Sequence, residues 1–137
     1  MNEDFAPFEL AVKLKEKGFG EECLCHYIGE DLVYNIESPI ANNQLWFSHN
    51  KFDNIWHRDN IDAPTISQVL KWLRKEKLIL IGLSPMQEYD GDETIEWCST
   101  VYKADKQGGL SWQEEFYYQS YEQAALAGIE YVLDNLI

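Results

Sequence analysis

The residues with the clearest chemical potential in this sequence are three cysteines and three histidines. Two cysteines and a histidine fall within residues 23–26, and His49 and His57 lie further along the chain. Thiolate and imidazole bind zinc, but one C-x-C pair without a second matched pair is weak evidence for a metal site. We therefore interpret Cys23 and Cys25 as small buried hydrophobic residues, and we expect neither a metal nor a cofactor.

A cysteine nucleophile with a histidine base would be the enzymatic interpretation of the same residues. Neighbouring residues in a strand point to opposite faces, so Cys25 and His26 are not expected to pair. His49 or His57 would have to supply the base, and nothing in the sequence selects either of them. We predict that the protein is not an enzyme. The alternative is a small hydrolase or transferase whose cleft contains these histidines and nearby carboxylates.

An acidic cluster is the first candidate for partner binding, because five acids fall within nine residues that contain no base: Glu88, Asp90, Asp92, Glu93 and Glu96. The cluster lacks the spacing of a calcium-binding loop with its glutamate at the twelfth position. A solvated hairpin tip is the plain interpretation. The functional interpretation is a surface that attracts a basic partner.

Trp72 is the second candidate for partner binding. It lies well off the apolar stripe of the helix in which we expect it. One interpretation packs its ring under the 37–61 region, and the other places it on a surface that faces a partner, where tryptophan is a frequent hot spot.

Aromatic residues also surround the last predicted strand. Phe116 and Tyr118 share one face of that strand and Tyr117 lies on the other, with Trp112 just before it. One face must belong to the core, so the rings on the other face are expected to form a surface suited to protein binding.

The net charge of −13 comes from 24 acidic and 11 basic residues in a chain of 137. Contacts with nucleic-acid phosphates need clustered cations, so we expect no direct binding of nucleic acid. The same charge argues against an anionic membrane surface. A basic protein is the partner that this composition favours.

The expected location is the cytoplasm. The N-terminal residues lack the basic and apolar regions of a signal peptide. The longest apolar run, residues 78–83, is far too short to span a bilayer. An odd number of cysteines without framework spacing predicts free thiols in a reducing compartment.

Periodicity and turn residues predict one domain over residues 1–137. Ser120 with Gln123 forms a capping-box pattern, and Ala125 and Gly128 would let the last helix approach a sheet closely. The fold class is α+β, with an antiparallel sheet of hairpins and helices on one face, in the order α-β-β-(loop)-α-β-β-β-α. The expected elements are a helix over 4–17, strands at 24–28 and 32–36, one or two short strands within 37–61, a helix from 62, strands at 78–83, 94–103 and 114–119, and a helix from 120.

Three segments, at residues 8–19, 63–77 and 120–137, read FELAVKLKEKGF, APTISQVLKWLRKEK and SYEQAALAGIEYVLDNLI. Together they resemble a group of small proteins of bacterial mobile elements and prophages, especially those of gut Bacteroidetes. The resemblance implies a phage-related origin and no particular activity.

The second half also resembles a double-stranded-RNA-binding domain in its α-β-β-β-α layout. That family carries a lysine cluster at the start of its last helix, where this chain has Ser120, Tyr121, Glu122 and Gln123. No lysine or arginine follows Lys106, so RNA binding by that route is not expected.

The function predicted from these observations is a non-enzymatic interaction protein of phage or mobile-element origin. Its acidic surface would bind a basic host protein, and a narrower version is a mimic of DNA. Besides the enzyme described above, a homo-oligomeric structural component is a second alternative, so a further copy of the chain stays open as a partner.

Overall fold

The computed structural model describes residues 4–34, 61–87 and 95–137. Its contacts divide the chain into two compact units, Met1–Thr65 (unit 1) and Ile66–Ile137 (unit 2). Within these described ranges, each unit contains one antiparallel three-stranded sheet. A single domain over residues 1–137 stays a prediction. The elements are α1 (Phe8–Glu16), β1 (Cys25–Ile28), β2 (Asp31–Tyr34), β3 (Ile61–Ala63), α2 (Ile66–Glu76), β4 (Ile79–Gln87), β5 (Ile95–Ala104), β6 (Leu110–Tyr118) and α3 (Tyr121–Asn135).

Unit 1 is built around the hairpin of β1 and β2, with β3 on the other side of β1. Ile28 pairs with Asp31, so Gly29 and Glu30 form a two-residue turn. Gly29 has a φ of +60°, which is the conformation that tight hairpin turns require at their first central residue. The predicted hairpin is therefore confirmed. The short β3 lies at the end of the segment in which one or two strands were expected.

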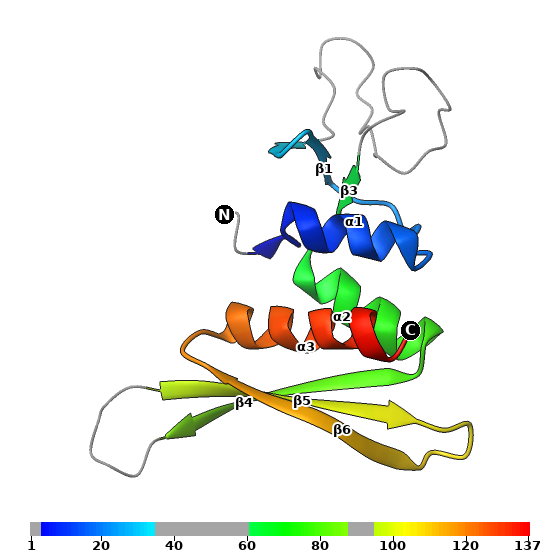
Figure 1. Ribbon diagram of the computed structural model, residues 1–137, viewed down its shortest axis with the longest axis vertical. Coiled ribbons are helices and arrows are strands. Elements are labelled where there is room, and N and C mark those ends of the chain that lie inside the picture. The colour runs from blue at the N-terminus through cyan, green and yellow to red at the C-terminus, as the bar shows by residue number, and fades with distance from the viewer. Residues whose placement is uncertain (1–3, 35–60, 88–94) are drawn as a thin grey trace. The chain divides into compact units, whose positions relative to one another are not determined.

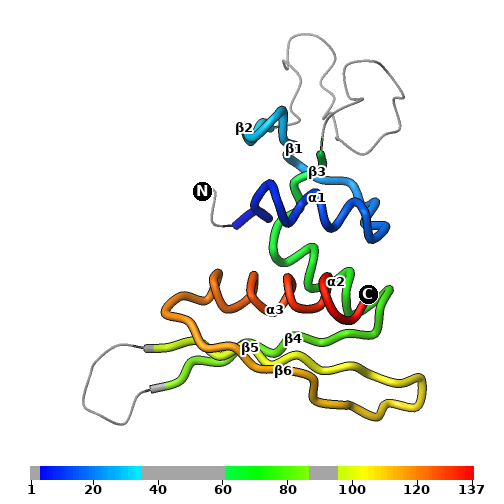
Figure 2. Tube along the Cα trace, viewed as in Figure 1, coloured from blue at the N-terminus to red at the C-terminus, as the bar shows by residue number. Residues whose placement is uncertain are grey.

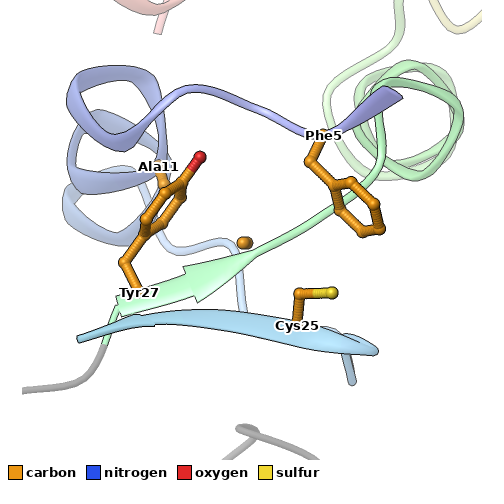
Figure 3. Packing of buried hydrophobic residues seen from close by; sticks show 5 residues of the cluster. Phe5, Ala11, Cys25 and Tyr27 are labelled. Carbon is orange, nitrogen blue, oxygen red and sulfur yellow. The ribbon is translucent and has the colours of Figure 1, made fainter. Parts of the chain in front are cut away.

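The core of unit 1 lies between α1 and the sheet. Figure 3 shows Cys25 and Tyr27 rising from β1, with Phe5 and Ala11 nearby. The Tyr27 hydroxyl donates a hydrogen bond of 2.6 Å to the buried carbonyl oxygen of Ala6. The ring of Tyr27 also meets the Phe8 ring edge to face, with centroids 5.5 Å apart. A tyrosine is suited to this site because its ring fills the core while its hydroxyl finds an acceptor.

Unit 2 carries the larger sheet, in the order β4-β5-β6. Its strands are joined as successive hairpins (Figure 2). Figure 1 shows α2 and α3 on the same side of this sheet. The α+β class with antiparallel hairpins is thus confirmed, and the strands form two sheets of three.

Helix α3 begins as its sequence predicts. Ser120 is its N-cap residue, and the Ser120 hydroxyl accepts a hydrogen bond of 3.1 Å from the backbone N–H of Gln123. Gly128 is buried against the sheet, where an added Cβ would lie 3.1 Å from Ile81 Cγ2. Small residues on this side of the helix therefore permit the close approach that was predicted.

Several boundaries differ from those predicted. Helix α1 begins at Phe8 instead of residue 4, because Pro7 precedes it in an extended conformation. Strand β4 continues to Gln87, and β6 already begins at Leu110. Both extensions occur where β4 or β6 pairs with the long β5, so pairing with a neighbour lengthens the strands.

Candidate functional site

Most of the predicted acidic cluster falls outside the described residues: Glu88, Asp90, Asp92 and Glu93. Its last member, Glu96, is half-buried in β5 and pairs with Met86 of β4. The role of the cluster in partner binding stays a prediction. His49 and His57, the histidines of the enzymatic alternative, also lie outside the described residues.

Trp72 is buried, with 4% of its surface exposed. The Lys77 ammonium lies 5.5 Å from the centroid of its ring, within the range of a cation–π contact. Burial removes the ring from the exposed surface that a partner would meet. Packing of the ring under the 37–61 region stays a prediction, because residues 37–60 lie outside the described residues. The apolar stripe of a helix predicts only one buried side. The sequence therefore could not predict that Trp72, which lies off the stripe, is also buried.

The three cysteines are free and buried. Burial raises the pKa of the Cys23 thiol well above its usual range, and the nearby carboxylates of Asp62 and Glu21 raise it further. Burial also raises the pKa of Cys25. Thiols in such surroundings remain protonated and make poor nucleophiles. Over residues 4–34, 61–87 and 95–137, no three or more histidine, cysteine or acidic side chains are placed to hold a metal ion.

The sheet of unit 2 has one face that its two helices do not cover. Ser99 of β5 lies against α3 at Gly128, so alternate residues of β5 from Glu96 to Ala104 face away from that helix. Directly opposed residues of an antiparallel pair share a face, which extends this assignment to β4 and β6. We call this surface the open face: Leu80, Gly82, Ser84, Met86, Glu96, Cys98, Thr100, Tyr102, Ala104, Leu110, Trp112, Glu115 and Tyr117.

Three large side chains of β6 stand out from the open face. Leu110 is 57% exposed, Trp112 55% and Tyr117 51%. Two members of the open face are acidic, Glu96 and Glu115, and none is basic. A surface that combines exposed aromatic rings with carboxylates is suited to bind cations.

A β-bulge determines which side chains of β6 share the open face. Val101 is paired with Glu114, whereas the next residue of β5, Tyr102, is paired with Trp112. Gln113 is therefore an extra residue in β6. In a regular strand, residues three positions apart point to opposite faces, but the bulge brings Trp112 and Glu115 to the same one.

Glu115 links the two exposed rings of this face. One carboxylate oxygen accepts a hydrogen bond of 3.2 Å from the indole nitrogen of Trp112. The other accepts a hydrogen bond of 2.5 Å from the Tyr117 hydroxyl, which raises the pKa of Tyr117 to about 12. A carboxylate has about four lone-pair sites, so Glu115 retains acceptor capacity while its orientation is set.

Comparison with protein-family models found no match for this chain. The curated proteins and the solved structures gave none either. The two resemblances found in the sequence therefore stay predictions.

The opposite side of β6 faces α3 and borders a groove of about 390 Å³. Phe116 and Tyr118 contribute their rings from the strand, and Tyr131 contributes a third from the helix. The ring centroids of Phe116 and Tyr131 are 5.7 Å apart. The other lining residues come from α3: Gln123, Leu126, Ala127, Glu130 and Asp134.

The two sides of β6 agree with the alternation seen in the sequence, with Phe116 and Tyr118 on one face and Tyr117 on the other. The sequence did not reveal the association of Trp112 with Glu115. Their spacing of three residues suggests opposite faces, and no glycine or proline marks the bulge between them. The pairing register of β5 and β6 therefore brings the exposed rings of Trp112 and Tyr117 to the two sides of the Glu115 carboxylate.

Proposed function

We propose that this protein is a non-enzymatic interaction protein that binds a basic protein partner on the open face of unit 2. The position of Glu115 supports this most, because its carboxylate accepts hydrogen bonds from two exposed aromatic side chains. A partner's arginine would stack on the Trp112 or Tyr117 ring while its guanidinium pairs with the carboxylate. Tryptophan and tyrosine anchors of this kind dominate the energy of many interfaces.

The charge of the chain supports a basic protein over other partners. The net charge is −13, and no basic residue follows Lys106. Phosphates of nucleic acids and anionic lipids would be repelled, whereas a basic protein would be attracted at long range. Every helix in the described ranges is too short or too polar to cross a bilayer. We also propose the cytoplasm as the location and a phage or mobile element as the origin, on the sequence features given above.

The proposed binding mode differs from simple mimicry of DNA. A mimic needs carboxylates spaced like phosphates, and the open face carries only two, Glu96 and Glu115, among apolar and aromatic side chains. Such a face favours aromatic anchoring of a few cationic side chains. The DNA-mimic version depends on residues 88–94, which lie outside the described residues.

The edges of the sheet do not favour strand addition, which is one way in which copies of a chain form a homo-oligomer. On β6, the backbone N–H of Glu115 donates to the Glu114 carboxylate, and the Ser111 carbonyl accepts from the Gln113 side chain. On β4, Pro85 has no N–H to offer. Side chains that occupy edge groups and prolines on edge strands both hinder pairing with another chain. The face of the sheet is therefore the better candidate for docking.

The experiment is site-specific photo-cross-linking in native host cells. Benzoylphenylalanine replaces Leu110 on the open face in one chain and Ile28 of β1 in a control, because their exposures are similar at 57% and 53%. We expect one or a few basic proteins to cross-link from position 110 only. Trp112→Ala in the same chain should reduce the yield about tenfold or more, as expected for a hot spot. Identical products from both positions, or a yield that Trp112→Ala does not change, would overturn the proposal.

A further inference from the structure

The open face offers a partner no backbone hydrogen bonds. The N–H and C=O groups of β4, β5 and β6 point towards neighbouring strands in the plane of the sheet, not out of its face. A segment that lies on the face must therefore satisfy its own backbone, since buried unpaired groups are destabilising. An α-helix does this internally, whereas an extended segment does not. An extended segment would need a sheet edge, where Pro85 of β4 hinders pairing.

The side chains of the open face also leave room for a helix. Four neighbouring positions of β4 and β5 carry small side chains: Gly82, Ser84, Cys98 and Thr100. The larger Glu115 and Tyr117 of β6 lie opposite Thr100 and Cys98. Among the described residues, a Cβ added to Gly82 would meet only the Thr100 carbonyl oxygen, at 4.0 Å. Large side chains of a docked helix can therefore occupy the space above β4 and β5, while β6 contacts its flank.

The charge of the face favours a basic helix over a second copy of this chain. Two acids, Glu96 and Glu115, belong to the open face, and no base does. Two copies packed through this face would bring these acids together, in a protein whose net charge is −13. A helix that carries arginine or lysine near Glu115 instead meets the face with complementary charge, beside two aromatic rings that suit a cation.

We propose that the open face binds a basic, amphipathic α-helix of the partner protein, which lies along the strands. The inference rests on the proposed function and adds the kind of segment that docks. Helix α3 has this arrangement on the opposite face, where it lies lengthwise over the strands (Figure 1).

The length of the face sets the length of the helix. Met86 and Leu110 lie near its two ends, because they pair with Glu96 and Ala104 of β5. Those two residues of β5 are eight positions apart, which corresponds to about 27 Å in a strand. A helix needs about 18 residues to cover this distance, whereas an extended segment needs about eight.

Photo-cross-linking from both ends of the open face measures this spacing in native host cells. Benzoylphenylalanine replaces Leu110 in one chain and Met86 in another, which are 57% and 44% exposed. Mass spectrometry then identifies the partner residue that each position captures. We expect both captured residues in one segment of one basic protein, about 15–20 residues apart. Secondary captures from a single position should fall three or four residues from the main one.

Variants of β4 test whether the segment covers this strand. Gly82→Leu should keep the fold, because the added side chain begins in open space and glycine is a poor strand residue. It should reduce the cross-linking yield from both positions about tenfold, and Gly82→Ala should have a smaller effect. If Gly82→Leu does not fold, Ser84→Leu on the same face takes its place. Ser67→Leu, which is exposed on α2 on the other side of the sheet, is the control and should not change the yield.

The outcomes separate this inference from the proposed function. No product from either position, a second copy of this chain as the product, or a yield that Trp112→Ala does not change would overturn both. Products that depend on Trp112 but come from residues about eight apart, or from separate segments, would overturn the helix alone. A yield that the β4 variant does not change would also overturn the helix alone.

Discussion

The two sheets in the described part of the chain are both antiparallel and three-stranded, but they differ in how far their cysteine and aromatic side chains are exposed. In unit 1, Cys25 is fully buried and Tyr27 is 7% exposed, and both lie in the core of that unit. In unit 2, the open face leaves Trp112 and Tyr117 more than half exposed. The thiols that first suggest chemistry are thus among the least accessible groups, whereas these rings are accessible to a partner.

Strand length helps to explain the difference. Strands β1 to β3 have three or four residues each, so nearly every inward side chain is needed for the small core of unit 1. Strands β4 to β6 have nine or ten residues and present a full second face. Helices α2 and α3 lie on one face only (Figure 1), and Leu110, Trp112 and Tyr117 are more than half exposed on the other. Exposed aromatic residues on such a face are a signature of interaction sites.

The largest expected effect concerns the reactivity of the buried thiols. Because Cys23, Cys25 and Cys98 are all buried, a thiol reagent should modify them about a thousandfold more slowly in the native protein than in denaturant. The raised pKa of Cys23 adds to this protection, since little thiolate forms. Titration with Ellman's reagent after unfolding without reductant should find three thiols per chain. An internal disulfide as the dominant species would break the comparison between the two sheets.

The second prediction tests the helix that covers unit 2. Gly128→Leu should destabilise the protein by roughly 3 kcal/mol, at the upper end of the usual cost of overpacking. Even a Cβ at this position would lie 3.1 Å from Ile81 Cγ2 and 3.4 Å from Ser99 Oγ. Ala125→Leu, on the same buried side, should cost roughly 1–3 kcal/mol. Chemical denaturation measures both, and unchanged midpoints would show that this side of α3 is not packed.

The third prediction concerns the core of unit 1. Tyr27→Phe removes the hydroxyl that donates to the buried Ala6 carbonyl and should cost about 1–2 kcal/mol. Tyr34→Phe is the matched control, because Tyr34 is 44% exposed, and it should change stability by less than about 0.5 kcal/mol. Equal changes in the free energy of unfolding for the two variants would contradict the burial of Tyr27 in the core of unit 1.

The smallest expected effect on stability comes from the hydrogen bond between Glu115 and Tyr117. It raises the pKa of Tyr117 from 10.0 to about 12, so its contribution is present below pH 10 and is lost as the pH rises through 12. Glu115→Gln should lower the pKa of Tyr117 towards its ordinary value and change stability little, because the site is exposed. Ultraviolet titration of the tyrosines, with Tyr117→Phe to assign the signal, measures this. If Glu115→Gln does not alter the titration of Tyr117, the hydrogen bond to Glu115 is not what raises the pKa of Tyr117.

Much of the local structure could be predicted because it depends on neighbouring residues. The cap of α3 needs only Ser120 and Gln123, and the hairpin turn needs only a glycine between two alternating strands. Alternation also predicts that Cys23, Cys25 and Tyr27 share one face, and all three are buried. The same rule predicts that Leu24, His26 and Ile28 share the other face. Leu24 and Ile28 are exposed there, but His26 is buried at 6%. Which side of a strand is covered depends on parts of the chain that are distant in sequence.

What the sequence by itself determined is the α+β class, the cap of α3, the amphipathic helices, the hairpins and the strong negative charge, because each depends on short-range periodicity or on composition. The tertiary structure alone decided that Trp72 is buried and that Glu115 joins Trp112 and Tyr117 on the open face. The physical reason is register: one extra residue in β6, at Gln113, reverses the face that Trp112 presents relative to Glu115. The register of β6 is fixed by its pairing with β5. That pairing cannot be inferred from the spacing of the β6 residues in the sequence.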